Sequence, residues 1–517
     1  MTPALGDGLP VRVAVVLWLV VMGLVLLPLL AVVVPPLHDY PFHLARADAI
    51  AALLGQVGHG TFYRLGSFAL ANEAMDVVTA GLTAMLAPVQ AGRVFLGLVQ
   101  VLLLGGTAAL HFALHRRLSV WPLVAGFFLY NGIFLYGFTN YLFGVAVMLW
   151  AVAVWVGLAR CGWAVRLGFG TVAAVVLVFC HLTAFGLFAV MLAGLALRDA
   201  MGRRQGGFWA QLLLPGVPVV IGLVVFVAIS PTAGEVRQPF AYHGWWGWKP
   251  LMAWRPLLGS DPVLDWLTLG PPVAMAVWLL AARRLVLAPV MPIPLLLLAA
   301  TFAVMPHALF GSLYGDARLP VAVLLVAIAS IDFRRLAPRT VMVGTVLLIL
   351  ALAGRGVAIA REWRAWEPVF ERHMAAFALL PEGSVLWAAT AAPYPTLAWR
   401  DGEERALWRP PLKHVASLAG VGRAVFVPST WADPTKQPIV VAPAFAAMKG
   451  LQGDNPFKTP TGAALAEVLA AIGRVNAREE VGHFLLLSYP QRLQGALPGG
   501  LEFVADGPAF QLLRIAR

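Results

Sequence analysis

A cluster of titratable side chains follows directly on the first long apolar run of the chain, residues 11–34. It contains His38, the carboxylate of Asp39, His43 and Arg46. Charged groups placed where a membrane helix ends must be stabilised by a ligand, a partner or water. These residue types indicate proton transfer by the carboxylate and the imidazoles, and binding of a phosphate by the guanidinium.

Two interpretations of Asp39 fit this pattern. If a helix begins near Pro41, His43 and Arg46 lie on adjoining faces and can both reach a headgroup beside Asp39, with Tyr40 as a further substrate contact. Alternatively, Asp39 only caps that helix, because an acidic residue just before a first-turn proline is a common helix start. Asp39 lies just after the first apolar run and has basic groups on both sides, so both interpretations remain open.

The composition defines the elements that must position this cluster. The 517 residues are 60% hydrophobic and only 12% charged, with a mean hydropathy of +0.81. This is more apolar surface than one soluble core can bury, so we expect a mainly α, polytopic membrane protein. The opening run is long enough to span a bilayer and lacks a small-residue cleavage site, which predicts a retained first helix.

Arginines recur in the short gaps between apolar runs, which places these gaps in the cytoplasm. The arginines concerned are Arg12, Arg116, Arg117, Arg160, Arg166, Arg198, Arg203, Arg204, Arg283, Arg284, Arg334, Arg335 and Arg339. The net charge of +12 therefore reports topology, and we predict no nucleic-acid partner. The pattern predicts an inner-membrane protein of a bacterium with a cytoplasmic N-terminus.

About eleven spans satisfy this charge pattern. They are 11–34, 91–114, 119–136, 141–159, 167–181, 183–197, 208–230, 263–282, 286–304, 319–333 and 341–357. The run 167–197 is divided near His181, because a single helix would put Arg160 and Arg198 on opposite sides. Residues 73–87 are expected to form a surface or re-entrant helix.

An odd number of spans leaves the tail, residues 358–517, outside the cell as a soluble domain, separate from the membrane domain 1–357. Short apolar runs alternate with helical patterns there, which predicts a small extracytoplasmic α/β domain. The expected strands are 384–389, 424–428, 438–442, 483–488 and 509–515, and the expected helices are 363–380, 412–419 and 462–474. Cys161 and Cys180 lie near opposite ends of one predicted span, so we expect no disulfide.

A second group of candidate residues lies at the mouth of the span 319–333. Arg318 could grip a phosphate there with two parallel hydrogen bonds, and Asp316 and His307 are further substrate-binding candidates. The alternatives are a surface ion pair between Asp316 and Arg318, a snorkelling arginine, and an interface histidine without a ligand.

Three further candidates rest on weaker signals. The aromatic stretch 240–249 is typical of a membrane interface, with a sugar-stacking platform as the alternative; Arg255 nearby could bind phosphate. Asp76 is a candidate acceptor contact, although helix-start chemistry explains it equally well. His181, in the middle of the predicted bundle, is costly unless it is satisfied.

The order of these features resembles the C-type (GT-C) superfamily of membrane glycosyltransferases: a long first helix, an outer loop opening with Asp39, successive spans and a soluble extracytoplasmic domain. Those enzymes use polyprenyl-phosphate sugars as donors. The resemblance implies that Asp39 is the first-loop acidic residue, acting as the base for an acceptor hydroxyl or as an organiser of the site. It also implies a basic site for the donor phosphate. The resemblance covers the whole architecture, but its motif is a few residues around Asp39.

One departure from that superfamily concerns metals. Many members carry a second acidic motif in the next outer loop, whereas residues 130–141 contain Asn131 and Asn140 and no carboxylate. We therefore assign no metal ligands, and leave a divalent cation bound by oxygen ligands open. The chain also lacks a Walker loop, a dinucleotide fingerprint, a His-Glu-x-x-His motif and paired cysteines at zinc spacing.

The resemblance, taken with these residues, implies transfer of a sugar from a polyprenyl-phosphate donor to an extracytoplasmic lipid or glycan acceptor. Asp39 accepts or orients the acceptor proton, while Arg46 and Arg318 hold the departing phosphate. Two other classes stay open. A lipid or glycan flippase is disfavoured because almost no charges lie deep in the spans, and a non-catalytic cell-envelope assembly protein would not need the loop carboxylate.

Overall fold

The computed structural model describes residues 11–55, 58–202, 208–237, 240–242, 245–259, 261–309, 312–333, 336–392, 411–475 and 481–516. Arg203, Arg204, Arg334 and Arg335 of the predicted cytoplasmic gaps, and His243 and Gly244 of the aromatic stretch, lie outside these residues.

The chain divides into two compact units. The first, called the membrane unit here, contains Met1–Leu30, Ala69–Ala74 and Leu96–Ala360. The second, called the sheet unit, contains Ala31–Phe68, Met75–Phe95 and Arg361–Arg517. The sequence predicts a single boundary after residue 357. In the structure, residues 31–68 and 75–95 also belong to the unit that contains the C-terminal residues.

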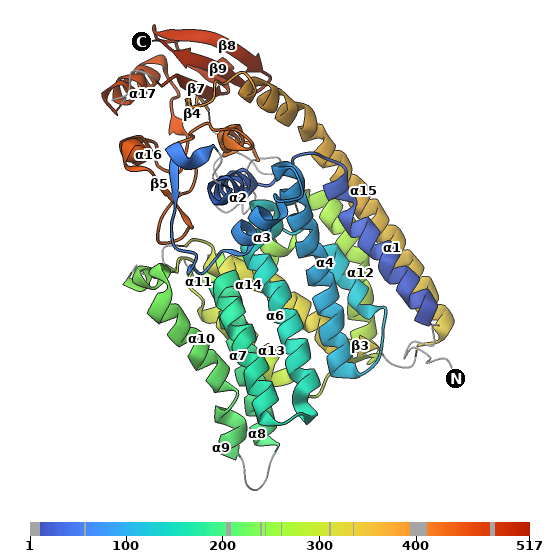
Figure 1. The fold of residues 1–517 in the computed structure, drawn as a ribbon. Coiled ribbons are helices and arrows are strands. Elements are labelled where there is room, and N and C mark those ends of the chain that lie inside the picture. The colour runs from blue at the N-terminus through green and yellow to red at the C-terminus, as the bar shows by residue number, and fades with distance from the viewer. Residues whose placement is uncertain are drawn as a thin grey trace. The chain divides into compact units, whose positions relative to one another are not determined.

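Apolar helices build the membrane unit (Figure 1). Its helices, including two that continue into the sheet unit, are α1 (Val11–Leu30), α4 (Pro88–His115), α5 (Gly132–Tyr136), α6 (Thr139–Gly157), α7 (Trp163–Cys180), α8 (Leu182–Met201), α9 (Phe208–Leu213), α10 (Gly216–Ile229), α11 (Trp245–Trp254), α12 (Pro262–Ala281), α13 (Pro292–Val304), α14 (Gly315–Ser330) and α15 (Pro338–Phe377). Among the described residues, eight helical segments are long and apolar enough to cross a membrane. Shorter apolar helices cover Trp121–Tyr136 and Pro292–Val304. The polytopic helical architecture is confirmed.

The division of the run 167–197 at His181 is also confirmed. Helix α7 ends at Cys180 and α8 begins at Leu182, and the backbone of His181 between them is extended, with φ −172° and ψ 125°. Its ring nitrogen Nδ1 accepts a hydrogen bond from the Thr183 backbone N–H at 3.1 Å. The imidazole thus satisfies one of the donors that every helix start leaves open.

The single helix predicted for 119–136 is wrong. A 3-10 helix, Trp121–Phe128, is followed by the short helix α5. The Asn131 side chain accepts hydrogen bonds from the Ile133 and Phe134 backbone N–H groups, both at 3.0 Å, and so starts α5 as a separate element. An asparagine that caps a new helix ends the preceding one, and this local chemistry outweighs the continuous apolar pattern.

A five-stranded mixed sheet forms the centre of the sheet unit (Figure 1). Its order is β6 (Phe457–Lys458), β4 (Val385–Thr390), β7 (His483–Ser488), β9 (Phe510–Ile515) and β8 (Leu501–Gly507). Strands β6, β4 and β7 are parallel, and β8 and β9 form an antiparallel hairpin beside β7. The helices α2 (Tyr40–Leu54), α3 (Ala74–Leu82), α16 (Ala446–Gln452) and α17 (Gly462–Val475) also belong to this unit.

Several predicted elements of this unit are confirmed and others are not. Strands β4, β7 and β9 and helix α17 match their predictions closely. The predicted strand 424–428 contributes only one bridge, between Phe426 and Val385, and the predicted helix 412–419 is a turn followed by a 3-10 helix, Val415–Gly420. Residues 363–380 do not begin a separate helix, because α15 continues without a break from Pro338 to Phe377.

First-loop residues complete the core of the sheet unit. Strand β1 (Tyr63–Leu65) pairs antiparallel with β5 (Ile439–Val441), with Tyr63 opposite Val441. Phe62 lies with Phe426 and Phe445 in the same buried cluster as the strand residue Trp387. Residues of the first loop and of the C-terminal segment therefore share one hydrophobic core.

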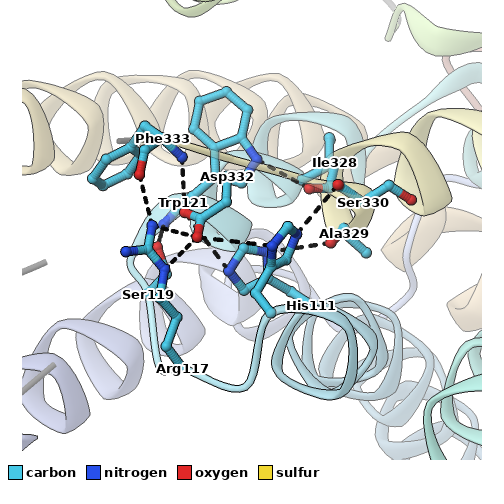
Figure 2. Close-up of polar contacts among 10 residues, drawn as sticks. His111, Arg117, Ser119, Trp121, Ile328, Ala329, Ser330, Asp332 and Phe333 are labelled. Atoms are coloured by element: carbon cyan, nitrogen blue, oxygen red, sulfur yellow. Dashed lines mark hydrogen bonds and ion pairs between the residues drawn. The ribbon is translucent and has the colours of Figure 1, made fainter. Parts of the chain in front are cut away.

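A buried polar cluster in the membrane unit joins the end of α4 to the strand β3 (Ile331–Phe333), as Figure 2 shows. The Asp332 carboxylate forms an ion pair with Arg117 and lies 4.0 Å from a ring nitrogen of both His111 and His115. Arg117 also donates to the Phe333 carbonyl at 2.6 Å.

Replacement of Asp332 by asparagine should destabilise the membrane unit by about 1–3 kcal/mol, because it leaves Arg117 without its charged partner. The measurement is denaturant unfolding of detergent-solubilised protein. Asp199→Asn is the matched control, since Asp199 pairs with Arg198 at 3.3 Å on the surface, where such a pair contributes little. Equal losses in the two variants would contradict the prediction.

Candidate functional site

Asp39 stands at the N-cap position of α2, but its side chain makes no capping hydrogen bond. Its Oδ1 instead faces Nε2 of His38 at 3.6 Å and Nε2 of His414 at 3.7 Å. All three side chains are buried, with 1–4% of each residue exposed. The interpretation of Asp39 as a simple helix cap is therefore wrong, and its carboxylate is directed at two imidazoles.

Aromatic rings from the C-terminal segment cover the start of α2. The centre of the Phe42 ring lies 3.9 Å from the centre of the His414 ring and 4.7 Å from that of the Trp431 ring. The rings of His43 and Trp431 meet edge-on, with their centres 5.8 Å apart. These contacts exclude water from the surroundings of Asp39 and strengthen its electrostatic interactions. Nothing in the sequence marks His414 or Trp431 as part of this site, since a single histidine in an apolar stretch is most often a core residue.

Arg46 and Asp76 form a buried ion pair. Nε of Arg46 donates to Oδ1 of Asp76 at 2.8 Å, and Nη2 lies 2.9 Å from Nδ1 of His43. Only 1% of Arg46 and 0% of Asp76 are exposed, and Nη1 of Arg46 and Oδ2 of Asp76 have no hydrogen-bond partner among the described residues. Burial raises the pKa of Asp76 against the opposing charge of Arg46. Burial and the Arg46 charge both lower the pKa of His43, which keeps the imidazole neutral.

Tyr40, predicted to contact substrate, is packed in the interior of the sheet unit. None of it is exposed, and a Cβ added at Gly92 of α4 would lie 2.3 Å from its hydroxyl oxygen. Glycine at position 92 therefore makes room for the phenol against the helix backbone. Burial raises the pKa of Tyr40.

The predicted residues around the mouth of α14 form a buried network in the membrane unit. Asp316 accepts hydrogen bonds from Lys249 Nζ and Trp248 Nε1, both at 3.0 Å, and lies 3.4 Å from Nδ1 of His307. Asp316 is completely buried, so its interpretation as half of a surface pair is wrong. Trp248 and Lys249 come from the aromatic stretch 240–249, whose Tyr242 is exposed as expected at an interface.

Arg318 is held by three contacts within the membrane unit. Its Nη1 lies 3.3 Å from Nε2 of His181, its Nη2 donates to the Leu313 carbonyl at 3.0 Å, and its guanidinium carbon lies 4.3 Å from the centre of the Phe138 ring. The residue is buried, which excludes a snorkelling side chain. A guanidinium is a donor well suited to a phosphate or carboxylate ligand.

Arg255 belongs to another buried group of the membrane unit. Asp265 accepts from Arg355 Nη1 at 2.8 Å and from the Gly259 backbone N–H at 2.7 Å. Burial lowers the pKa of Arg255, and the nearby Asp265 carboxylate opposes that shift. This group carries two guanidinium charges and one carboxylate charge.

The predicted site residues thus fall into both units. His38, Asp39, Tyr40, His43, Arg46 and Asp76 lie in the sheet unit, and Arg255, His307, Asp316 and Arg318 lie in the membrane unit. The first set offers a carboxylate next to two imidazoles, which suits proton transfer. The second offers buried cations, which suit an anionic ligand.

Apolar spans followed by a mixed sheet define a polytopic membrane protein with a C-terminal α/β unit. No protein-family model and no curated protein sequence matches the chain. Two solved structures of ArnT from Cupriavidus metallidurans are similar in fold. The apo structure gives a TM-score of 0.52 at 13% identity, covering 98% of this chain and 98% of that chain. The structure bound to undecaprenyl phosphate gives 0.51 at 13% identity, covering 98% and 97%.

A third structure, the arabinofuranosyltransferase AftD from Mycobacteria, covers 100% of this chain and 41% of its own chain, with a TM-score of 0.47 at 14% identity. The two ArnT likenesses cover both units and show that the chain has the ArnT fold, which confirms the predicted polytopic helical architecture with a C-terminal α/β unit. The chain is an integral membrane protein of that fold.

Proposed function

We propose that this protein transfers a sugar from a polyprenyl-phosphate donor to an extracytoplasmic lipid or glycan acceptor. The observation that carries the proposal is the geometry of Asp39, a buried carboxylate directly after the first membrane helix whose Oδ1 faces two imidazoles. A carboxylate in that setting can take the proton of an acceptor hydroxyl as the new glycosidic bond forms. The C-type fold agrees with this chemistry.

In the proposed reaction the acceptor oxygen attacks the anomeric carbon of the donor sugar and the bond to the phosphate oxygen breaks. The proton of the acceptor hydroxyl passes to Asp39, and the polyprenyl phosphate leaves with the bonding electrons. Negative charge grows on the leaving phosphate, so a fixed cation near it lowers the barrier. We assign this part to Arg318, a buried arginine in the first turn of α14 that contacts His181 and Phe138.

Arg46 is better suited to positioning than to binding phosphate. Its charge is balanced by Asp76 at 2.8 Å inside the sheet unit. We assign it to holding α2, and with it Asp39, against α3. The nature of the donor is supported by the ArnT structure bound to undecaprenyl phosphate, a polyprenyl phosphate.

The proposed orientation puts the N-terminus in the cytoplasm and Asp39 on the extracytoplasmic side of a bacterial inner membrane. The arginines in short gaps between apolar runs support it. Labelling of a single cysteine at position 54 or 60, both exposed, by a membrane-impermeant reagent on intact spheroplasts, in a variant without Cys161 and Cys180, tests this orientation. Labelling only after lysis would overturn it.

The test of the proposed function uses the full chain purified in detergent. We expect polyprenyl phosphate to co-purify, detectable by mass spectrometry, and radiolabelled sugar to move from an undecaprenyl-phosphate donor to cell-envelope lipid or glycan fractions. Lipid binding without sugar transfer, with accelerated flipping of the lipid in vesicles, would favour the flippase instead. Absence of all three activities would favour an assembly protein.

Replacement of Arg318 by glutamine should weaken binding of undecaprenyl phosphate by about 10- to 150-fold, the value of a hydrogen bond to a charged group. The measurement is displacement of a fluorescent polyprenyl phosphate from detergent-solubilised protein. Arg166→Gln is the matched control, because Arg166 is an equally buried arginine of the same unit that lies 4.4 Å from the Trp155 ring. Equal weakening in the two variants would refute the assignment.

A further inference from the structure

We infer that His38, Asp39 and His414 form a binding site for one divalent transition-metal ion of the zinc type. Each of the three side chains offers one ligand atom, and these atoms all lie within 4.8 Å of one another. Oδ1 of Asp39 lies 3.6 Å from Nε2 of His38 and 3.7 Å from Nε2 of His414. The inference does not depend on the proposed sugar transfer.

The spacing of these atoms fits a metal better than direct hydrogen bonds. The separations of 3.6 Å and 3.7 Å between nitrogen and oxygen are too long for a hydrogen bond. Ligand atoms about 2.0–2.1 Å from a tetrahedral zinc ion are roughly 3.3–3.4 Å apart. A small closure of the three side chains around an ion would reach that geometry.

The ligand types and their burial agree with this assignment. Two imidazoles and one carboxylate form a common donor set for zinc and neighbouring transition metals, one that leaves a coordination position for water or substrate. Magnesium and calcium prefer oxygen ligands and fit this set poorly. Each residue is only 1–4% exposed, and the Phe42 ring covers His414 at 3.9 Å, so a bound ion would be shielded from bulk water.

A bound ion would join parts of the sheet unit that are far apart in the sequence. His38 and Asp39 precede α2, whereas His414 precedes the 3-10 helix Val415–Gly420. Metal binding should therefore stabilise the packing of this segment against α2, because a ligand that binds only the folded state stabilises it. At the open position the ion would act as a Lewis acid next to Asp39.

Metal content of the full chain tests the inference. The protein carries a Strep tag, since a histidine tag would itself bind metal. After treatment with EDTA and dialysis against zinc, we expect about one zinc per chain by mass spectrometry, and we expect cobalt to give the visible absorption of a low-symmetry site. His38→Ala and His414→Ala should each lower zinc affinity more than about 100-fold. Replacing a residue that contacts only a metal ligand, and not the metal itself, has a smaller effect.

His59→Ala is the matched control. His59 is a buried imidazole of the same unit that lies 3.6 Å from a carboxylate, that of Asp48. Among the described residues, no third metal-binding group completes a cluster with this pair. This variant should bind zinc like the wild type. A wild-type protein that binds no more zinc than His414→Ala, or that gives no cobalt absorption, overturns the inference, and the cobalt experiment needs no variant that could misfold. Zinc binding without sugar transfer would leave the site in place and refute only the proposed function.

Discussion

The Asp39→Asn protein is expected to fold and to bind undecaprenyl phosphate normally, but to transfer sugar about 10²- to 10⁴-fold more slowly, the usual contribution of a general base. Asparagine has the shape of aspartate and cannot accept the proton of an acceptor hydroxyl. The carboxylate makes no capping hydrogen bond to α2, so the substitution removes no cap from that helix. The measurement is the rate of radiolabelled sugar transfer at saturating donor.

Asp48→Asn controls for a general effect of losing a buried carboxylate on this helix. Asp48 also lies in α2, 3.6 Å from a histidine, and accepts a hydrogen bond from the Gly422 N–H at 2.7 Å. It is expected to lose stability and to keep its transfer rate per folded molecule. Full activity of a folded Asp39→Asn protein would refute the role of Asp39, and equal loss in both variants would indicate a structural effect.

The Asp76→Ala protein should lose about 3–5 kcal/mol of unfolding free energy, because Arg46 would remain buried without its charged partner. Arg46 is only 1% exposed and lies 2.8 Å from Asp76, so water cannot replace the carboxylate without local opening. The double variant Arg46→Met with Asp76→Leu removes both charges and should recover most of the loss. Denaturant unfolding followed by tryptophan fluorescence measures all three proteins.

Glu502→Gln supplies the comparison for that experiment. Glu502 pairs with Arg514 in the same unit at 3.8 Å, with both side chains 60% exposed, and a pair of that kind contributes less than about 1 kcal/mol. If Asp76→Ala lost no more stability than Glu502→Gln, the buried ion pair would not hold α2 against α3.

Periodicity and charge in the sequence predicted much of the fold. The break at His181 followed from the arginines on each side of it, because each short gap with basic residues must return to the cytoplasm. The strands β4 and β7 followed from short apolar runs between polar turns. A helix starting after Asp39 followed from Pro41, whose ring fixes a backbone angle that suits the first helical turn.

The same local reasoning failed where two segments meet across the chain. Strand β1 pairs with β5. The sequence predicted β5 as the strand 438–442, but it did not predict β1, whose three residues are too few to be recognised without a partner. The alternative interpretation of Asp316 and Arg318 as a surface ion pair was wrong for a related reason. The carboxylate is buried, and it is satisfied by Lys249 and Trp248 from a different helix.

By itself the sequence determined that this protein is a polytopic membrane protein, that a carboxylate follows its first span, and that an α/β segment ends the chain. These properties follow from composition, hydrophobic period and local charge, which each residue carries wherever it lies. The tertiary structure decided that His414 and Trp431 lie beside Asp39 and that Arg46 binds Asp76. Such contacts join residues distant in sequence, and they form only when a shared hydrophobic core brings those segments together.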